Sequence, residues 1–321
     1  MEFVSLCYHY IKDAKRTERY PRIYANMDTQ LEEHTKLFTR EYHPLSPEDI
    51  RRQYVDKQIP AIDRTGVVVT FDDGLNDHYL AAQILARNGI RAFFFVPTCI
   101  LTDRLPANPQ IIHYTLALHG IAAFLSLYDS LLEARDLHAD ERFRVRYKKG
   151  RAAETIAQIK KIFKYELPAA TGREILLTIY NRLLLTHTPH ILDDIHLTET
   201  QIRKMLDMGH MIGTHTHTHI SVAATQLTPE EFHTEVIKPK QILREMFNTP
   251  VYALSYPFGG KADCLATKDL IQTTSVYDLA FTVEKRVNTE YTSPLEIGRY
   301  EPYPGDDTDV LQDKLLALAR V

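Results

Sequence analysis

The sequence has few cysteines, no marked excess of charge and no long uninterrupted apolar run. Its three cysteines, Cys7, Cys99 and Cys264, are scattered and lack metal-type spacing. A disulfide framework is therefore excluded, and we expect free, buried thiols in a reducing compartment. The formal net charge of −4 over 321 residues offers no general attraction to nucleic acid or anionic lipid. No nucleic-acid partner is expected, and any basic site must be local.

Neither a leader nor a membrane-spanning segment is expected. The first residues, Met1 to Cys7, contain no basic region before an apolar stretch and no small-residue cleavage site, which predicts a cytoplasmic protein. The longest apolar stretch, Leu116 to Leu132, is interrupted by polar residues such as His119 and Asp129. We predict a buried helix here and no integral membrane segment, because ~30 Å of hydrocarbon requires a longer unbroken apolar run.

The chain does contain an alternation of short apolar runs with longer amphipathic ones. A strand is expected up to Phe71, a helix over 77–88 and a second strand over 91–96. The same order returns at Thr198, a predicted helix cap that precedes a strand at 211–212. Alternating strands and helices predict an α/β fold with a parallel sheet, open or closed into a barrel.

The later part of the chain continues this alternation. Its best signalled helix follows the cap Thr228, with Pro229 at the first position and Glu231 completing a capping box. Further strands are expected at 251–256, 279–283 and 295–297, and a final helix at 307–319.

Between about 105 and 197 the pattern changes to consecutive helical stretches. One is expected over 152–163, and another is expected from Thr171, with Glu174 in a capping box. The proline-rich patch 105–109 marks where these helices leave the core. The predicted organisation is one α/β domain formed by 1–104 and 191–321, with a helical insertion at 105–190.

The first string with chemical significance is Thr70–Gly74, which reads Thr-Phe-Asp-Asp-Gly. It closes the apolar run Val67–Val69, typical of a strand buried on both faces, and Gly74 then allows a sharp turn. Asp72 and Asp73 are therefore expected at the carboxyl end of a strand. Taken alone, such a string is also compatible with a plain turn and an exposed acidic cap.

The second string, Gly213–His219, alternates threonine with three histidines. In a strand His215, His217 and His219 share one face, whereas on a helix His217 points away, so spacing leaves all three as candidates. A half-exposed strand with histidines facing water is the alternative. Two imidazoles and one carboxylate bind a divalent ion and leave positions for water and substrate, while a second carboxylate accepts a proton. The two strings together favour metal-dependent hydrolysis.

These strings resemble motifs of the polysaccharide deacetylases of carbohydrate esterase family 4. The family's first motif reads Thr-Phe-Asp-Asp-Gly, as in Thr70–Gly74, and its second reads His-Ser/Thr-x-x-x-His or a close variant, as in His215–His219. Ser255–Gly260 is similar to the third motif of a subgroup with Tyr-Pro-Phe-Gly, and Tyr8–His9 is also typical of the family. The resemblance covers about 3–10, 67–97 and 198–299.

The resemblance implies a distorted (β/α)7 barrel and a metal-dependent deacetylase. It assigns Asp73, His215 and His219 as metal ligands and Asp72 as the catalytic base, and His217 becomes a bystander. Zinc is the expected ion, although two histidines and one carboxylate also suit iron, cobalt or manganese. No organic cofactor is expected.

Two residues that assist catalysis in the family, an arginine and a histidine, are not found at their usual positions. Ser255 stands where many members place an arginine that orients the catalytic aspartate, and we expect Arg299 to take over that task. The family's last motif supplies a histidine as general acid. The last histidine here, His233, lies in a predicted helix, so that residue is missing. His9 is the candidate acid, because an amino-terminal barrel strand can end at the active-site mouth. The backbone N–H of Phe258, which follows the third-motif proline, is expected to hold the oxyanion.

The predicted activity is removal of an N-acetyl or other acyl group from a sugar in cell-surface polysaccharide or glycan biosynthesis. A basic cluster at 142–151 is compatible with phosphate of a nucleotide- or lipid-linked sugar, although charge runs usually face water. Two alternatives stay open, since the usual arginine and late histidine are absent: hydrolysis of a cyclic amide or imide on the same barrel, and a catalytically inactive sugar-binding protein. The oligomeric state is not indicated.

Overall fold

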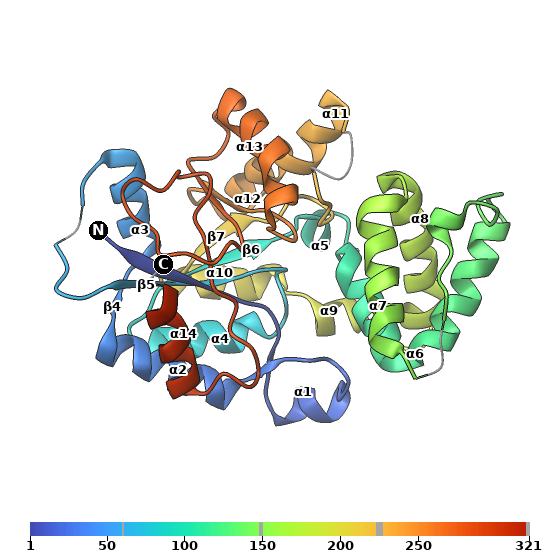
Figure 1. Ribbon diagram of the computed structural model, residues 1–321, viewed down its shortest axis with the longest axis horizontal. Helices are drawn as coiled ribbons and strands as arrows, with labels where there is room; N and C mark the ends of the chain where they lie inside the picture. The colour runs from blue at the N-terminus through green and yellow to red at the C-terminus, as the bar shows by residue number, and fades with distance from the viewer. Residues whose placement is uncertain (60, 148–149, 223–226, 319–321) are drawn as a thin grey trace.

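The computed structural model describes residues 1–59, 61–147, 150–222 and 227–318 (Figure 1). The strands are β1 (Phe3–Tyr8), β2 (Ile11–Lys12), β3 (Asn26–Met27), β4 (His43–Pro44), β5 (Gly66–Phe71), β6 (Ala92–Val96), β7 (Met211–Thr214), β8 (Ala253–Ser255) and β9 (Leu279–Phe281). The helices are α1 (Ala14–Arg19), α2 (Asp28–Glu41), α3 (Pro47–Arg51), α4 (His78–Arg87), α5 (Cys99–Thr102), α6 (Asn108–Glu133), α7 (Ala152–Lys161), α8 (Ala169–Ile179), α9 (Ile191–Ile195), α10 (Glu199–Asp207), α11 (Pro229–Phe232), α12 (Lys238–Phe247), α13 (Lys261–Thr274) and α14 (Thr308–Leu318). Short π-helical segments extend four of them, at Arg52–Asp56, Ile162–Glu166, Tyr180–Leu185 and His233–Ile237.

A curled parallel sheet forms the centre of the molecule. Its strand order is β1-β5-β6-β7-β8-β9, and β4 pairs with the start of β5. Side chains of successive residues in β5 point to opposite faces. Val67, Val69 and Phe71 pack against the surrounding helices, whereas Val68 packs with Phe93 inside the barrel. Burial on both faces explains why these strands are continuous apolar runs in the sequence.

An irregular segment closes the barrel between β9 and β1. Ile297 pairs with Phe281 of β9, and Tyr300 pairs with Leu6 of β1, each through a single parallel bridge. The predicted strand at 295–297 is therefore wrong, because the segment crosses from one neighbour to the other before a ladder can form. The predicted distorted (β/α)7 barrel is confirmed.

Helices α6, α7 and α8 stand beside the barrel (Figure 1). They share a hydrophobic cluster that also includes Tyr10, Tyr20 and Leu75. Length and composition alone would allow α6 to cross a membrane, but one such helix is weak evidence, and 44% of its apolar window is buried inside the protein. Gly120, at φ 79° and ψ 173°, interrupts the helical backbone in the middle of α6. Phe124 and Tyr128 lie in the core of the cluster.

Helix starts follow the local capping chemistry in two of three predicted cases. The capping boxes of Thr198 and Thr228 both form. The predicted box of Thr171 does not, because α8 begins two residues earlier, after Pro168, and Thr171 lies inside the first turn. The fixed φ of proline favours a helix start at that point.

Candidate metal and catalytic site

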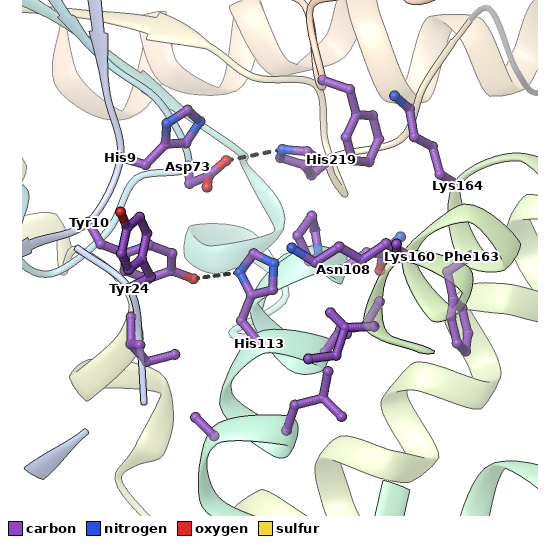
Figure 2. A pocket seen from close by; sticks show the side chains of 18 of the residues that line it. His9, Tyr10, Tyr24, Asp73, Asn108, His113, Lys160, Phe163, Lys164 and His219 are labelled. Carbon is purple, nitrogen blue, oxygen red and sulfur yellow. Dashed lines mark hydrogen bonds and ion pairs between the residues drawn. The ribbon is translucent and has the colours of Figure 1, made fainter. Parts of the chain in front are cut away.

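The two motif strings meet at the carboxyl edge of the parallel sheet. Asp72 and Asp73 follow β5, His215 follows β7, Ser255 ends β8, and His9 lies one residue after β1. Because parallel strands end at one edge, residues from distant parts of the chain come together there. The four resulting carboxylate and imidazole groups face a large cavity (Figure 2).

Asp73, His215 and His219 form a buried group whose ligand atoms lie within 4.8 Å of one another. Nε2 of His219 is 3.0 Å and Nε2 of His215 is 3.4 Å from Oδ1 of Asp73. His217 is turned away: its Nε2 is 3.0 Å from a carboxylate oxygen of Asp103. The structure thus places His215 and His219 together and His217 apart from them. Spacing alone did not distinguish the three histidines.

The donor set of this group fits a divalent cation. Nδ1 of His215 donates to the carbonyl oxygen of Ser255 at 2.8 Å, so the lone pair of its Nε2 faces Asp73. Oδ1 of Asp73 is buried and receives no well-directed hydrogen bond from any described residue. Two lone-pair atoms this close repel each other unless a positive charge lies between them. Two imidazole nitrogens and one carboxylate oxygen are ligands for zinc, iron, cobalt or manganese.

Three residues of the site adopt left-handed backbone conformations that non-glycine residues rarely take. The φ angles are 80° at Asp73, 66° at His219 and 64° at Phe258. Such conformations cost about 1–3 kcal/mol each and persist only where the surrounding structure enforces them. They aim the side chains of Asp73 and His219 at each other.

Asp72 has surroundings that differ completely from those of Asp73. Arg299 donates to both of its carboxylate oxygens, at 2.8 and 2.7 Å. The other N–H groups of Arg299 bond Thr70 Oγ1, Ser255 Oγ and the carbonyl of Thr282, so all five of its donors are used. Burial acts to raise the pKa of Asp72, but the charge and hydrogen bonds of Arg299, together with the nearby charges of His215 and His9, outweigh it and hold that pKa well below the ordinary value.

The hydroxyl of Ser255 contacts the same carboxylate. It donates to Oδ2 of Asp72 at 2.9 Å while it accepts from Arg299. Serine at this position therefore leaves room for Arg299 to enter from the closing segment of the barrel. The structure brings Asp72 and Arg299 together as the sequence predicted.

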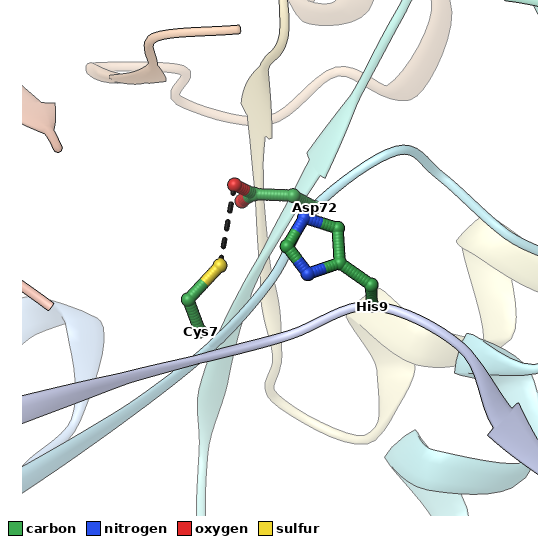
Figure 3. A group of neighbouring side chains, drawn as sticks. All are labelled: Cys7, His9 and Asp72. Atoms are coloured by element: carbon green, nitrogen blue, oxygen red, sulfur yellow. Dashed lines mark hydrogen bonds between the residues drawn. The ribbon is translucent and has the colours of Figure 1, made fainter. Parts of the chain in front are cut away.

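Cys7 is an unexpected neighbour of this carboxylate (Figure 3). Its thiol donates to Oδ2 of Asp72 at 3.4 Å, and Cys7, His9 and Asp72 have ligand atoms within 4.8 Å of one another. Burial raises the pKa of Cys7 well above its ordinary value, so no thiolate forms at neutral pH. With Arg299 already bound to Asp72, this second group does not suit a metal.

His9 is half-buried and points toward the two aspartates. Its Nδ1 is 3.2 Å from a carboxylate oxygen of Glu301, and its carbonyl accepts from Nε2 of His78 at 3.1 Å. Burial acts to lower the pKa of His9, but Glu301 and the two aspartates outweigh it and raise the pKa to about 9. Glu301 carries no motif, and only its place two residues after Arg299 could have drawn attention to it.

The helical insertion contributes two residues that no motif indicated. Gln110, fully buried on α6, donates to Oδ2 of Asp73 at 2.8 Å. His113, one turn later, hydrogen-bonds the hydroxyl of Tyr10 at 3.0 Å (Figure 2). Burial lowers the pKa of His113 to about 3, so it is neutral. Their spacing on one face of a helix was the available signal.

Phe258 lies beside the metal-type group. Its ring meets His219 edge to face at 4.8 Å between centroids, and Nζ of Lys164 lies 4.1 Å above the same ring. Among the residues that the structure describes, the backbone N–H of Phe258 has no acceptor. Gly259 continues the turn at φ 61°, where a Cβ would meet the backbone nitrogen of Val283 at 2.9 Å.

The site opens into a cavity of about 1280 Å³ between the barrel and the helical insertion (Figure 2). Lys164, in the π-helical turn after α7, reaches the barrel and pairs with Asp263 at 2.9 Å. The described arginines of the basic cluster at 142–151 are all in ion pairs. These four arginines pair with nearby carboxylates at 2.6–3.3 Å, and positions 148 and 149 lie outside the described residues.

The chain is similar to known proteins in part of its sequence and in its fold. Residues 176–275 match the family model described as polysaccharide deacetylase. Over 98% of each chain, the structure is similar to the Streptococcus pyogenes deacetylase PplD in complex with acetate, at 18% identity and a TM-score of 0.60. IcaB from Ammonifex degensii matches at 17% identity and a TM-score of 0.57, over 98% of this chain and 97% of that one.

The BpsB deacetylase domain from Bordetella bronchiseptica matches at 14% identity and a TM-score of 0.51, over 94% of this chain and 95% of that one. No curated protein sequence matches the chain. At these identities the structural likeness establishes the fold. The chain therefore has the fold of the polysaccharide deacetylases, and its residues 176–275 match that family in sequence.

Proposed function

We propose that this protein is a metal-dependent deacetylase that removes an N-acetyl, or another acyl, group from a sugar of a cell-surface polysaccharide or glycan precursor. One observation carries the proposal: a cation-type ligand group and a separate carboxylate held by Arg299 share one end of a large cavity. The family match and the Tyr-Pro-Phe-Gly string support it. A cytoplasmic location is part of the same proposal.

The ligand group consists of Asp73, His215 and His219. A divalent ion bound there, zinc being the first choice, would polarise the acyl carbonyl and lower the pKa of water. Hydrogen bonds to Ser255 and Gln110 orient His215 and Asp73 before any ion arrives. Such outer contacts usually tune metal sites.

Asp72 is proposed as the general base. Arg299 keeps its carboxylate ionised at neutral pH and fixes its orientation through two parallel hydrogen bonds. The carboxylate can therefore accept a proton from the attacking water in one defined direction. A base of this kind typically contributes 10²- to 10⁴-fold in rate.

Phe258 is proposed to stabilise the oxyanion, and His9 is proposed to protonate the leaving amine. The backbone N–H of Phe258, which has no acceptor in the described part of the chain, would donate to the oxyanion that develops on the carbonyl oxygen of the acyl group. His9, protonated at neutral pH because its pKa is about 9, would give its proton to the leaving amine. Glu301 lies behind His9 and stabilises the charged imidazole.

A combined metal and substrate assay tests this function. The purified protein is analysed for bound metal. Acetate release is measured from a panel of N-acetylated sugars, free, polymeric, nucleotide-linked and lipid-linked, and hydrolysis of small cyclic imides is measured beside it. Bound metal with acetate release supports the proposal. Turnover of small cyclic imides alone would favour the imide hydrolase, and bound metal without turnover would favour a sugar-binding protein.

A further inference from the structure

The cavity has two walls of very different chemistry. The barrel wall carries the charged site, whereas α6, α7 and α8 line the opposite wall with mostly aliphatic and small side chains (Figure 2). The larger of these are Ile112, Leu116, Ile121, Ile156 and Leu176. Sugar hydroxyls lose hydrogen bonds with water when they are buried, and aliphatic side chains cannot replace those bonds. The aliphatic part of the wall, formed by α6, α7 and α8, is therefore poorly suited to a further stretch of glycan, whereas the rings of Tyr147, Phe163 and Tyr165 lie outside these helices.

Helix α6 has apolar surface that the described residues do not cover. Only 44% of its apolar window is buried, and Leu116 and Ile121, both partly buried, face the cavity. Covering this surface with an apolar partner would contribute about 25 cal/mol of favourable free energy for each Å² buried. Large uncovered apolar patches beside a site mark binding surfaces.

Lys160 is a cation on the insertion side of the cavity. Lys160 extends from α7 across the cavity toward His113 (Figure 2). Its neighbours Lys161 and Lys164 pair with carboxylates at 3.1 and 2.9 Å. Lys160 forms no ion pair within the described ranges. Burial lowers its pKa, and the nearby charges of Asp73 and Glu301 act against that effect. A free ammonium there suits an anionic group of the substrate.

We propose that the acylated sugar is carried on a phosphate that bears a long apolar chain, as in an isoprenoid phosphate. The sugar lies at the Asp73 group, the phosphate contacts Lys160, and the chain lies along Leu116 and Ile121. The sugar's position rests on the proposed function, whereas the phosphate and chain positions rest on the insertion wall alone. A nucleobase fits this wall less well, because its polar edge would meet aliphatic side chains.

Binding is the first test, and it needs no catalysis. Calorimetry on the Asp73→Ala variant compares farnesyl phosphate, farnesol and inorganic phosphate. This variant is expected to hold no metal at the Asp73, His215 and His219 group, so phosphate cannot bind through a metal there. Farnesyl phosphate is expected to bind at least tenfold more tightly than either fragment. Equal affinity for inorganic phosphate would show an anion site only, and would overturn the proposal.

Matched variants locate the binding surface. Lys160→Ala and Leu116→Gln are each expected to weaken farnesyl phosphate binding about tenfold or more. Leu118→Gln is the control for the apolar wall, because Leu118 lies on the same helix, is 39% exposed and does not line the cavity. Lys238→Ala, on α12, is the control for charge. Equal losses in test and control variants would contradict the assignment.

Turnover is the second test. The acetamido sugar 1-phosphate is supplied as a methyl ester, a farnesyl ester and a uridine nucleotide, and kcat/KM is measured for each. The farnesyl ester is expected to exceed the methyl ester at least tenfold, and Leu116→Gln should bring that ratio toward one. A preference for the nucleotide, or equal rates for all three, overturns the inference. Absence of acetate release from every ester would instead refute the proposed function, and the binding result would still decide this inference.

Discussion

Asp72 and Asp73 are neighbours in the chain but differ in what surrounds their carboxylates. Asp73 faces two imidazoles, and Asp72 faces a guanidinium. Asp72→Asn should therefore keep bound metal and lose hydrolysis by 10²-fold or more, whereas Asp73→Ala should lose the metal itself. Metal content after dialysis and acetate release distinguish the two. Full activity in Asp72→Asn would rule out its role as base.

Arg299 also has a measurable effect on stability. Replacing it with methionine leaves Asp72 buried without its partner, which should lower the free energy of unfolding by about 3–5 kcal/mol at pH 7. The pKa of Asp72 is lowered in the folded state, so this stabilisation is present above the ordinary carboxyl pKa and is lost as pH falls through the lowered one. Urea unfolding of the metal-free protein measures it.

The double variant Arg299→Met with Asp72→Asn is the control, because it removes both charges and should recover part of the lost stability. Arg299→Lys should not restore the parent value, since an ammonium cannot supply the five fixed donors. If the free energy of unfolding of Arg299→Met lay within about 1 kcal/mol of the parent value, the buried ion pair of Arg299 with Asp72 would not have the expected effect on stability.

His9 gives a pH prediction with a definite sign. Its pKa rises from 6.5 to about 9, so its stabilising charge is complete below 6.5 and disappears as pH rises through about 9. As general acid it should make kcat/KM fall above about pH 9. Glu301→Gln removes the nearest carboxylate and should move that fall to lower pH. An unchanged alkaline limb in both His9→Ala and Glu301→Gln would exclude His9 as the acid.

At the scale of elements, α6 links the insertion to the metal-type group. Gln110 holds one oxygen of Asp73, leaving the other for an ion. Gln110→Ala should therefore weaken zinc affinity about 10- to 100-fold without changing the ligands themselves. Competition with a chelating dye measures this affinity. Gln272→Ala, on the exposed face of α13, is the control, and equal zinc affinity in the two variants would argue against a positioning role.

Elements with local signals were predictable, and those held by distant contacts were not. The strand that ends at Phe71 and the capped helix after Thr198 depend on apolar periodicity and side-chain caps that lie within a few residues. The segment at 295–297 also looks like a strand, but its partners are β9 and β1, far away in the sequence. The closing segment forms single bridges and no strand because of its position between β9 and β1 in the closed barrel, which the local sequence does not indicate.

The same distinction applies to the candidate site. The strings alone left three histidines as candidates, and their resemblance to the family's motifs selected Asp73, His215 and His219. The structure brings these three together, while their metal-binding role stays a prediction. Contacts to Asp72 from Cys7 and to Asp73 from Gln110 arise from pairings across the fold, for which the sequence holds no motif.

At the scale of the whole molecule, the barrel and the insertion together make the cavity. The barrel supplies charged and hydrogen-bonding groups, and the insertion supplies the aliphatic wall and Lys160. Neither part encloses the substrate space alone. The helical insertion was predicted from a change of periodicity, but its position against the barrel depends on contacts such as that of Lys164 with Asp263.

The closing segment of the barrel also sets an order of events during synthesis. Asp72 is made early, and its strand can pair with β1 long before the chain reaches Arg299. Until then, the carboxylate lacks the cation that keeps it ionised when buried. The segment that joins β9 to β1 also carries Arg299, so closure of the barrel brings the guanidinium to the proposed base. A nascent chain therefore contains the metal-type ligands before it contains a working base.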